Sequence, residues 1–186
     1  MTQDLHILFQ APITNLSITS LINSVENANA KNIYLFIDSN GGLTREVIRF
    51  FTYIQAKNIN LTTVNLSQAN SAGFLLFLCG EERICPQFSI FVVHEPGFSS
   101  ATTLKQAKEI IALNETSLKN DYLFIKSRSS LKKETWDKWT SCNLYAIDSM
   151  EAIEHHIATT NKMLSIPKDA KAVSYTHLTL PTILLV

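Results

Sequence analysis

The sequence predicts an α/β domain with a mainly parallel sheet, and two observations carry that prediction. Strand-like and helix-like segments alternate from residue 6 to residue 80, an order that places successive strands parallel in one sheet. One of the strands, NIYLFID at 32–38, is an almost unbroken apolar run, which indicates a strand covered on both faces. With 186 residues, the chain has room for one domain with a proper core.

The first elements follow from local apolar spacing. HILFQAP at 6–12 predicts a strand that ends at its proline, and SITSLINSVENANA at 17–30 predicts a helix because its apolar residues recur at helical spacing. The SNGG sequence at 39–42 predicts a turn after the strand at 32–38. The residues whose spacing predicts the inner face of the next helix are Val47, Ile48, Phe51 and Ile54.

The middle of the chain continues the alternation. LTTVNL at 61–66 predicts another strand, and SAGFLLFLCG at 71–80 predicts a buried helix that stops at its final glycine. RIC at 83–85 and SIFVVH at 89–94 predict two further strands. In parallel α/β folds the turns at the carboxyl ends of the strands carry the chemistry, so the polar turns of this region are the place to look for a site.

A single long helical pattern runs from Thr102 to Ser127. At about 1.5 Å per residue this helix would be roughly 39 Å long, more than so small a domain can cover. We therefore expect part of it to project or to pack on a partner. Shorter helices are predicted around 133–139 and 149–156.

The final segment, VSYTHLTLPTILLV at 173–186, does not share the patterning of the rest of the chain. A terminal strand is one interpretation. The interpretation adopted here is foreign sequence from a frameshift or assembly error, so the segment is excluded from the fold prediction. The predicted domain is therefore 1–165.

Composition and charge exclude several classes of function. Sixteen basic residues balance sixteen acidic ones, so no net field favours nucleic acid or an anionic membrane. The cysteines, Cys79, Cys85 and Cys142, lack metal-ligand spacing, and the first two lie in apolar surroundings, which favours a reduced, cytoplasmic setting. No signal peptide is evident, and no apolar run approaches the roughly 18 residues of a membrane span. We expect a cytoplasmic protein without a metal or cofactor.

Ser71, within QANSAG at 68–73, is the first candidate catalytic residue. A serine at the start of a helix is usually an N-cap. The same position also suits a nucleophile, because the N–H that follows it, on Ala72, can donate to a developing oxyanion. Gly73 would allow a close backbone approach.

A serine hydroxyl needs a base, and His94 is the candidate because it ends the strand at 89–94 on the same edge as Ser71. A lone histidine there is more often structural. Gly41 and Gly42 supply a second turn whose N–H could complete an oxyanion hole, although a double glycine is usually just a turn.

Taken together and in this order, IYLFIDSNGG, QANSAGFLLFLCG and IFVVHEP resemble the Clp protease proteolytic subunit family, the self-compartmentalising serine peptidases of the ClpP/crotonase fold. The resemblance covers about residues 5–160. It implies a spiral of repeated β-β-α units with the long helix as a projecting handle. It also implies a serine endopeptidase that cleaves peptides or unfolded proteins through an acyl-enzyme.

Carried over by position, the resemblance makes Ser71 the nucleophile, His94 the general base, and the N–H groups of Gly42 and Ala72 the oxyanion hole. The implied partners are further copies of the chain in a homo-oligomeric ring and an AAA+ ATPase unfoldase or a paralogous subunit. The segment GFSSATTLKQ at 97–106 is several residues shorter than in the family, which puts double-ring assembly and coupling to an unfoldase in doubt.

The third catalytic residue of the family, an aspartate, has no counterpart at the matching position. Counting back from Glu151 leads to Leu144, with Asn143 beside it. Asn143 can accept from an imidazole N–H but cannot offer an imidazolium a full charge. Asp148 is the nearest carboxylate, and its spacing to Glu151 is that of a capping box. The third member, Asn143, Asp148 or none, is left open.

The leading hypothesis is therefore a serine endopeptidase. The alternative is a catalytically degenerate subunit with a structural or regulatory role in a ring, and a crotonase-like acyl-CoA enzyme is a third. Few charges flank the elbow, which favours apolar substrate side chains.

Overall fold

The computed structural model of the chain describes residues 4–94, 103–162 and 164–174. In chain order the elements are β1 (Leu5–Gln10), α1 (Asn15–Ala28), β2 (Asn32–Ser39), α2 (Thr44–Ala56), β3 (Asn60–Ala69), α3 (Ala72–Leu78), β4 (Glu82–Ile84), β5 (Phe91–Val93), α4 (Leu104–Arg128), α5 (Lys133–Thr140), β6 (Tyr145–Ile147), α6 (Ser149–Glu154) and β7 (Lys171–Ser174).

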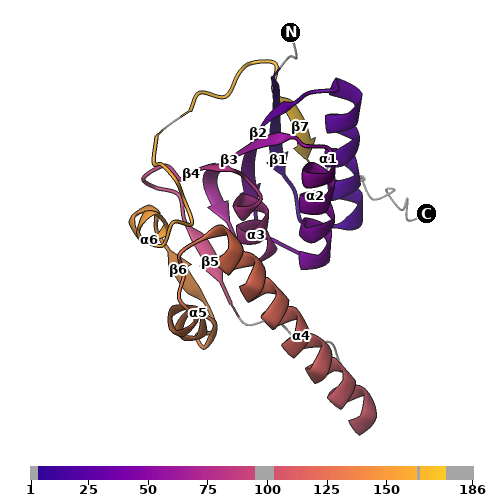
Figure 1. The fold of residues 1–186 in the computed structure, drawn as a ribbon, viewed down its shortest axis with the longest axis vertical. Helices are drawn as coiled ribbons and strands as arrows, with labels where there is room; N and C mark the ends of the chain where they lie inside the picture. Colours follow the sequence, from indigo (N-terminus) through magenta and orange to yellow (C-terminus); the bar gives the residue numbers. More distant parts are fainter. Residues whose placement is uncertain (1–3, 95–102, 163, 175–186) are drawn as a thin grey trace, which may run out of the picture.

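The core of the fold is a five-stranded sheet in the order β4-β3-β2-β1-β7, in which every neighbouring pair is parallel (Figure 1). Strands β5 and β6 form a separate antiparallel pair. Both observations confirm the predicted α/β class with a mainly parallel sheet. Parallel neighbours end at the same edge, so the turns after β1, β2 and β3 meet there.

The two faces of the sheet are covered unequally. Leu5, Ile33 and Leu61 are in register on one face and belong to the large core that includes residues of α1, α2 and α3. On the opposite face a smaller cluster gathers around Phe36, with Tyr34 only partly buried. The prediction that the strand at 32–38 is covered on both faces is therefore correct for its centre and wrong for Tyr34.

Helix α3 is buried along its whole length, as predicted, and ends shortly before Gly80. In α2 the inner face is rotated relative to the prediction. Phe50 is buried, whereas Ile48 is 38% exposed. Apolar residues at neighbouring positions of α2 fit a helical spacing in more than one way, and in the packed structure Phe50 is the one that faces the core.

Helix α4 projects from the body of the molecule, as predicted (Figure 1). Ile125 is its one buried residue, near its carboxyl end. Leu104, the first residue of the helix, is 74% exposed, and Leu113 is 68% exposed. The apolar residues in the first half of α4 are therefore left uncovered by the part of the chain that the structure describes.

Two short strands differ from the prediction: β6 was not expected at all, and β7 includes the start of the segment that the fold prediction excluded. β6 pairs with β5, and β7 pairs with β1, where Val173 is buried. Residues 173 and 174 thus lie in the sheet, and the rest of the segment 173–186 lies outside the described residues. Residues 97–102, which belong to the segment 97–106 expected to be shorter than in the family, also lie outside them. Among the described residues no helix has the length and apolar character needed to cross a membrane.

A buried arginine ties the late segments of the chain to the sheet. The Arg83 side chain, on β4, donates to the carbonyls of Ile157 (2.6 Å), Gly80 (2.9 Å), His156 (2.9 Å) and Arg128 (3.0 Å). Burial, with help from the neighbouring Arg128 charge, lowers the pKa of Arg83 to about 10. The guanidinium stays charged at neutral pH and joins the ends of α3 and α4 to the segment after α6.

We expect Arg83→Ala to lower the free energy of unfolding by about 3 kcal/mol, because buried carbonyls lose charged donors and a cavity is left. Denaturant unfolding measures the change. Arg45→Ala is the matched control, since the Arg45 side chain is 78% exposed, and its change should stay below about 0.5 kcal/mol. Equal effects of the two substitutions would contradict the role given to Arg83.

Candidate active site

Ser71 lies in a strained elbow between β3 and α3. Its backbone has φ 53° and ψ −120°, a region that side-chain-bearing residues rarely occupy. It stands at the N-cap position of α3, yet its side chain makes no capping hydrogen bond. The N-cap interpretation of this serine is therefore wrong. A sharp strand-to-helix turn of this kind exposes the hydroxyl of a nucleophile.

Several hydrogen bonds hold the elbow in place. The Ser71 N–H donates to the Val92 carbonyl of β5 (2.7 Å), and the Val92 N–H donates to Asn70 Oδ1 (2.9 Å). The Gly73 N–H donates to the Asn70 carbonyl (2.7 Å), closing the turn itself. The elbow is thus attached directly to the strand that precedes His94.

Ser39 connects the elbow to the ends of β1 and β2. Its hydroxyl donates to the Ala11 carbonyl (2.7 Å) and accepts from the Gly41 N–H (3.2 Å). Its carbonyl accepts from the Asn70 N–H (2.9 Å). This buried serine fixes the distance between the glycine turn and the elbow.

The glycine turn approaches the elbow too closely for side chains. At Gly41, where φ is 94°, an added Cβ would lie 2.5 Å from the Asn70 carbonyl oxygen and 2.8 Å from Ser71 Cβ. At Gly42, where φ is 148°, it would lie 2.2 Å from the Ile13 carbonyl oxygen. Both positions therefore require glycine, because a side chain at either one would clash with the neighbouring backbone. Gly41 is the glycine that contacts the elbow.

The N–H groups proposed for the oxyanion hole are available. Among hydrogen bonds between described residues, neither the Gly42 N–H nor the Ala72 N–H has an acceptor. Gly42 and Ser71 line the same cavity, and the Ala72 N–H lies at the start of α3, directly after Ser71. Free N–H groups beside a nucleophile are what stabilises a developing oxyanion.

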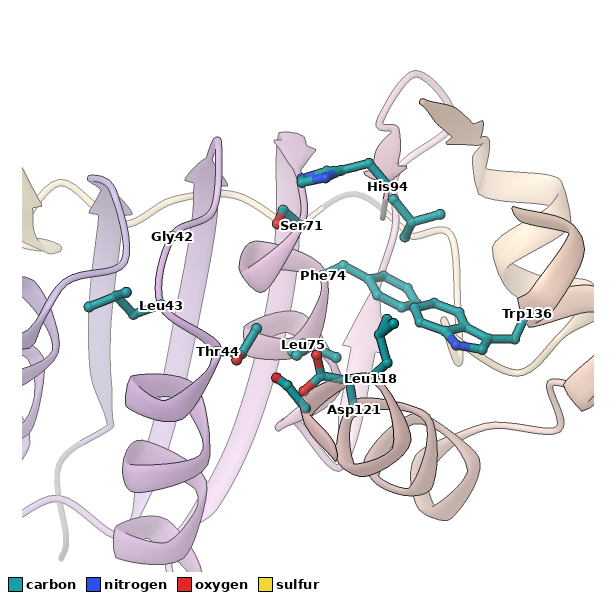
Figure 2. A pocket seen from close by; sticks show the side chains of 12 residues that line it. Gly42, Leu43, Thr44, Ser71, Phe74, Leu75, His94, Leu118, Asp121 and Trp136 are labelled. Atoms are coloured by element: carbon teal, nitrogen blue, oxygen red, sulfur yellow. The ribbon is translucent and has the colours of Figure 1, made fainter. Parts of the chain in front are cut away.

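His94 follows β5 and is half-buried at the rim of the same cavity. Figure 2 shows its ring extending from the strand end toward Ser71. The position is set by β5, whose approach to the end of β3 is fixed by the Ile90 N–H bond to the Ser67 carbonyl (2.9 Å). The structure brings Ser71 and His94 to one cavity, although the two side chains are not hydrogen-bonded to each other.

The candidates for the third catalytic position lie elsewhere. Asn143 is exposed in the turn between α5 and β6, and Asp148 is the N-cap of α6, where it accepts from the Glu151 N–H (2.8 Å). Neither lines the cavity. The Glu151 side chain accepts from the Tyr145 hydroxyl (3.0 Å), so the reciprocal half of the predicted capping box is not formed.

The cavity has a volume of about 280 Å³ and lies between the elbow, the glycine turn and the helices α4 and α5 (Figure 2). Its lining residues are Gly42, Leu43, Thr44, Ser71, Phe74, Leu75, Val93, His94, Ser117, Leu118, Asp121 and Trp136.

Asp121, on α4, is a cavity residue that the sequence analysis did not single out. Burial raises the pKa of its carboxyl group to about 6. In Figure 2 it lies at the end of the cavity away from His94, with Leu75 and Leu118 nearby. A signal was present in the sequence, because Asp121 is an acid three residues after Leu118 and four before Ile125, on the inner stripe of the helix.

The cysteines have no part in the cavity. Cys79 and Cys85 are buried, as predicted, and burial raises the pKa of both thiols. They are therefore protonated packing residues rather than nucleophiles. In the part of the chain that the structure describes, no three His, Cys, Asp or Glu side chains come together in a way that could hold a metal ion.

A parallel α/β sheet with a strained serine elbow at its carboxyl edge is typical of hydrolytic enzymes that use a serine nucleophile. The sequence model of the Clp protease family matches residues 3–137. The chain therefore belongs to the Clp protease family, as its sequence motifs predicted.

A solved structure of a ClpP1 mutant from Listeria monocytogenes has the same fold, with a TM-score of 0.67 over 84% of this chain and 89% of that chain. At 17% sequence identity this likeness bears on the fold alone. It confirms the predicted ClpP-like fold.

We expect Gly41→Ala to destabilise the protein by about 3 kcal/mol, because its Cβ would press on the elbow backbone. Thermal and denaturant unfolding measure this. Asn40→Ala, one residue earlier on the exposed side of the same turn, should change stability by less than about 0.5 kcal/mol. A Gly41→Ala protein as stable as the Asn40→Ala protein would show that the turn can move away from the elbow.

The buried Asp121 carboxyl predicts a pH-dependent stability. Its folded-state pKa is raised from 3.8 to about 6, so its stabilising contribution is complete below about pH 3.8 and is lost as the pH rises through about 6. We expect Asp121→Asn to be more stable than the native chain by about 1 kcal/mol at pH 8, after allowance for solvent screening, and equal to it near pH 4.

Urea unfolding at several pH values tests this expectation. Glu109→Gln removes the same charge from an exposed position on α4 and is the matched control. A stability difference for Asp121→Asn that does not vary between pH 4 and pH 8 would contradict it.

Proposed function

We propose that this chain is a serine endopeptidase that cleaves peptides or unfolded proteins. The observation that carries the proposal is the strained Ser71 elbow. The Ser71 hydroxyl does not cap helix α3, and Ser71 lines the same cavity as His94 and Gly42. Membership of the Clp protease family supports the same reaction class.

In the proposed reaction, Ser71 Oγ attacks the scissile carbonyl carbon while His94 takes the hydroxyl proton. The oxyanion accepts hydrogen bonds from the N–H groups of Gly42 and Ala72. The C–N bond then breaks, and the leaving amine takes the proton from His94. Water, activated by the same histidine, hydrolyses the acyl-enzyme and restores Ser71. The hydrogen bond between Ser71 and His94 would form on substrate binding or assembly, as catalytic contacts commonly tighten in the complex.

We expect a fluorophosphonate to form an adduct on Ser71, detected by intact mass and peptide mapping. Ser71→Ala should give no adduct, and His94→Ala should label about 10³-fold more slowly because the general base is lost. Ser67→Ala, an exposed serine on β3, is the control and should label like the native chain. No adduct on a well-assembled oligomer would contradict the proposal.

The third catalytic position is tested on the same samples. Asn143→Ala slows labelling if Asn143 orients the imidazole in the assembled protein, and Asp148→Asn does so if Asp148 has that role. Unchanged labelling in both variants means that neither residue contributes and that His94 is oriented by other contacts.

Two observations favour a second candidate function, a ring component without its own activity. Neither Asn143 nor Asp148 lines the cavity, and α4 exposes Leu104 and Leu113, which suits association with further subunits. Co-purification with an active paralogous subunit would favour this alternative, whereas robust peptidase activity of the homo-oligomer would contradict it. Both proposals include an AAA+ unfoldase as a partner and a cytoplasmic location.

A further inference from the structure

The cavity beside Ser71 has two chemically different ends. At one end are the groups proposed for catalysis, Ser71 and His94 (Figure 2). The walls are mostly apolar and include Phe74, Leu118 and Trp136, and two hydroxyl-bearing residues, Thr44 and Ser117, complete the lining. At the other end lies the Asp121 carboxyl group (Figure 2). A chain that reaches in from Ser71 therefore passes apolar surface before it meets a carboxyl group.

The Asp121 carboxyl has no compensating partner within the described ranges. None of the ion pairs or side-chain hydrogen bonds found between described residues involves Asp121, and the described residues that line the cavity include no lysine or arginine. An uncompensated, half-buried carboxylate lowers stability, and such groups are concentrated at binding and catalytic sites. At pH 7.5 it is predominantly ionised, since its pKa is about 6.

Resting on the peptidase function proposed above, we propose that this cavity receives the substrate side chain next to the scissile bond and that Asp121 makes it select lysine or arginine. The methylene stem of a basic side chain packs on the apolar walls, and the terminal cation reaches the carboxylate. An apolar side chain of the same length leaves the carboxylate desolvated and unpaired, which costs binding. The charge comes from α4, far in sequence from the elbow, and replaces the expected apolar preference.

The test compares two diphenyl phosphonates that carry a lysine-like or an isosteric norleucine-like side chain. With each probe a bond forms between Ser71 Oγ and phosphorus, a P–O bond breaks, and phenol leaves with the serine proton. The rate of adduct formation is followed by intact mass at pH 7.5. We expect the native chain to favour the basic probe by at least about 10-fold, the range that a paired buried charge supplies.

Asp121→Asn should bring the ratio of the two rates to about 1, while Glu109→Gln, which removes an exposed charge of α4, should keep the native ratio. Asp121→Asn is expected to fold, because it removes a destabilising charge, and its melting temperature checks this. A native ratio near 1, or a ratio that Asp121→Asn leaves unchanged, would overturn the specificity role and leave the peptidase proposal standing.

The ratio should also fall as the pH drops below about 6, where Asp121 takes up its proton. Among the described residues of the lining, His94 is the other titratable group, and its role as general base affects the rates of both probes alike. The nearby charged groups on α4 and α5, Glu115, Lys119, Lys133 and Asp137, line the adjoining cavity instead. A ratio independent of pH would contradict the assignment to Asp121. Failure of both probes and of a simple fluorophosphonate to label Ser71 would overturn the peptidase function and this inference together.

Discussion

The close contact between the glycine turn and the serine elbow is the constraint on which the rest of the site depends. Gly41 lies against the Asn70 carbonyl oxygen and Ser71 Cβ so closely that a side chain at position 41 would clash with both. The contact exists because β2 and β3 are parallel neighbours and end at the same edge. Once these strands are paired, Ser39 and Asn70 fix the turn and the elbow to each other. The surrounding structure thereby keeps Ser71 in its strained backbone conformation, which the residue would not adopt by its own conformational preference.

The second support of the site comes from β5, a strand outside the main sheet. Its Val92 exchanges hydrogen bonds with Ser71 and Asn70, so the segment that carries His94 is attached to the elbow itself. Displacing β5 would move the proposed base and release the elbow at the same time. The proposed nucleophile and base are therefore coupled through backbone contacts, which is a stiffer arrangement than two side chains on independent loops.

Helix α4 joins an exposed apolar surface to the wall of the cavity. Its amino-terminal half exposes Leu104, Ile111 and Leu113, while its carboxyl-terminal half packs near Ile125 and places Asp121 in the cavity. A burial that raises the pKa of Asp121 lowers the stability of the protein at neutral pH. Ionisable groups with shifted pKa values in cavities are concentrated at binding and catalytic sites, which is why Asp121 carries the specificity proposal.

Local sequence determined the order and type of nearly every helix and strand, because apolar spacing is a property of neighbouring residues. It also indicated Ser71, His94 and the glycine turn, since a polar motif in an apolar setting stands out along the chain. Local spacing did not identify β6 or β7, which are three and four residues long and owe their existence to β5 and β1. Only the tertiary structure showed that Asn143 and Asp148 lie outside the cavity and that Asp121 lies within it. Those positions are set by the tertiary packing of α4, α5 and α6, which depends on contacts between segments that are distant in the sequence.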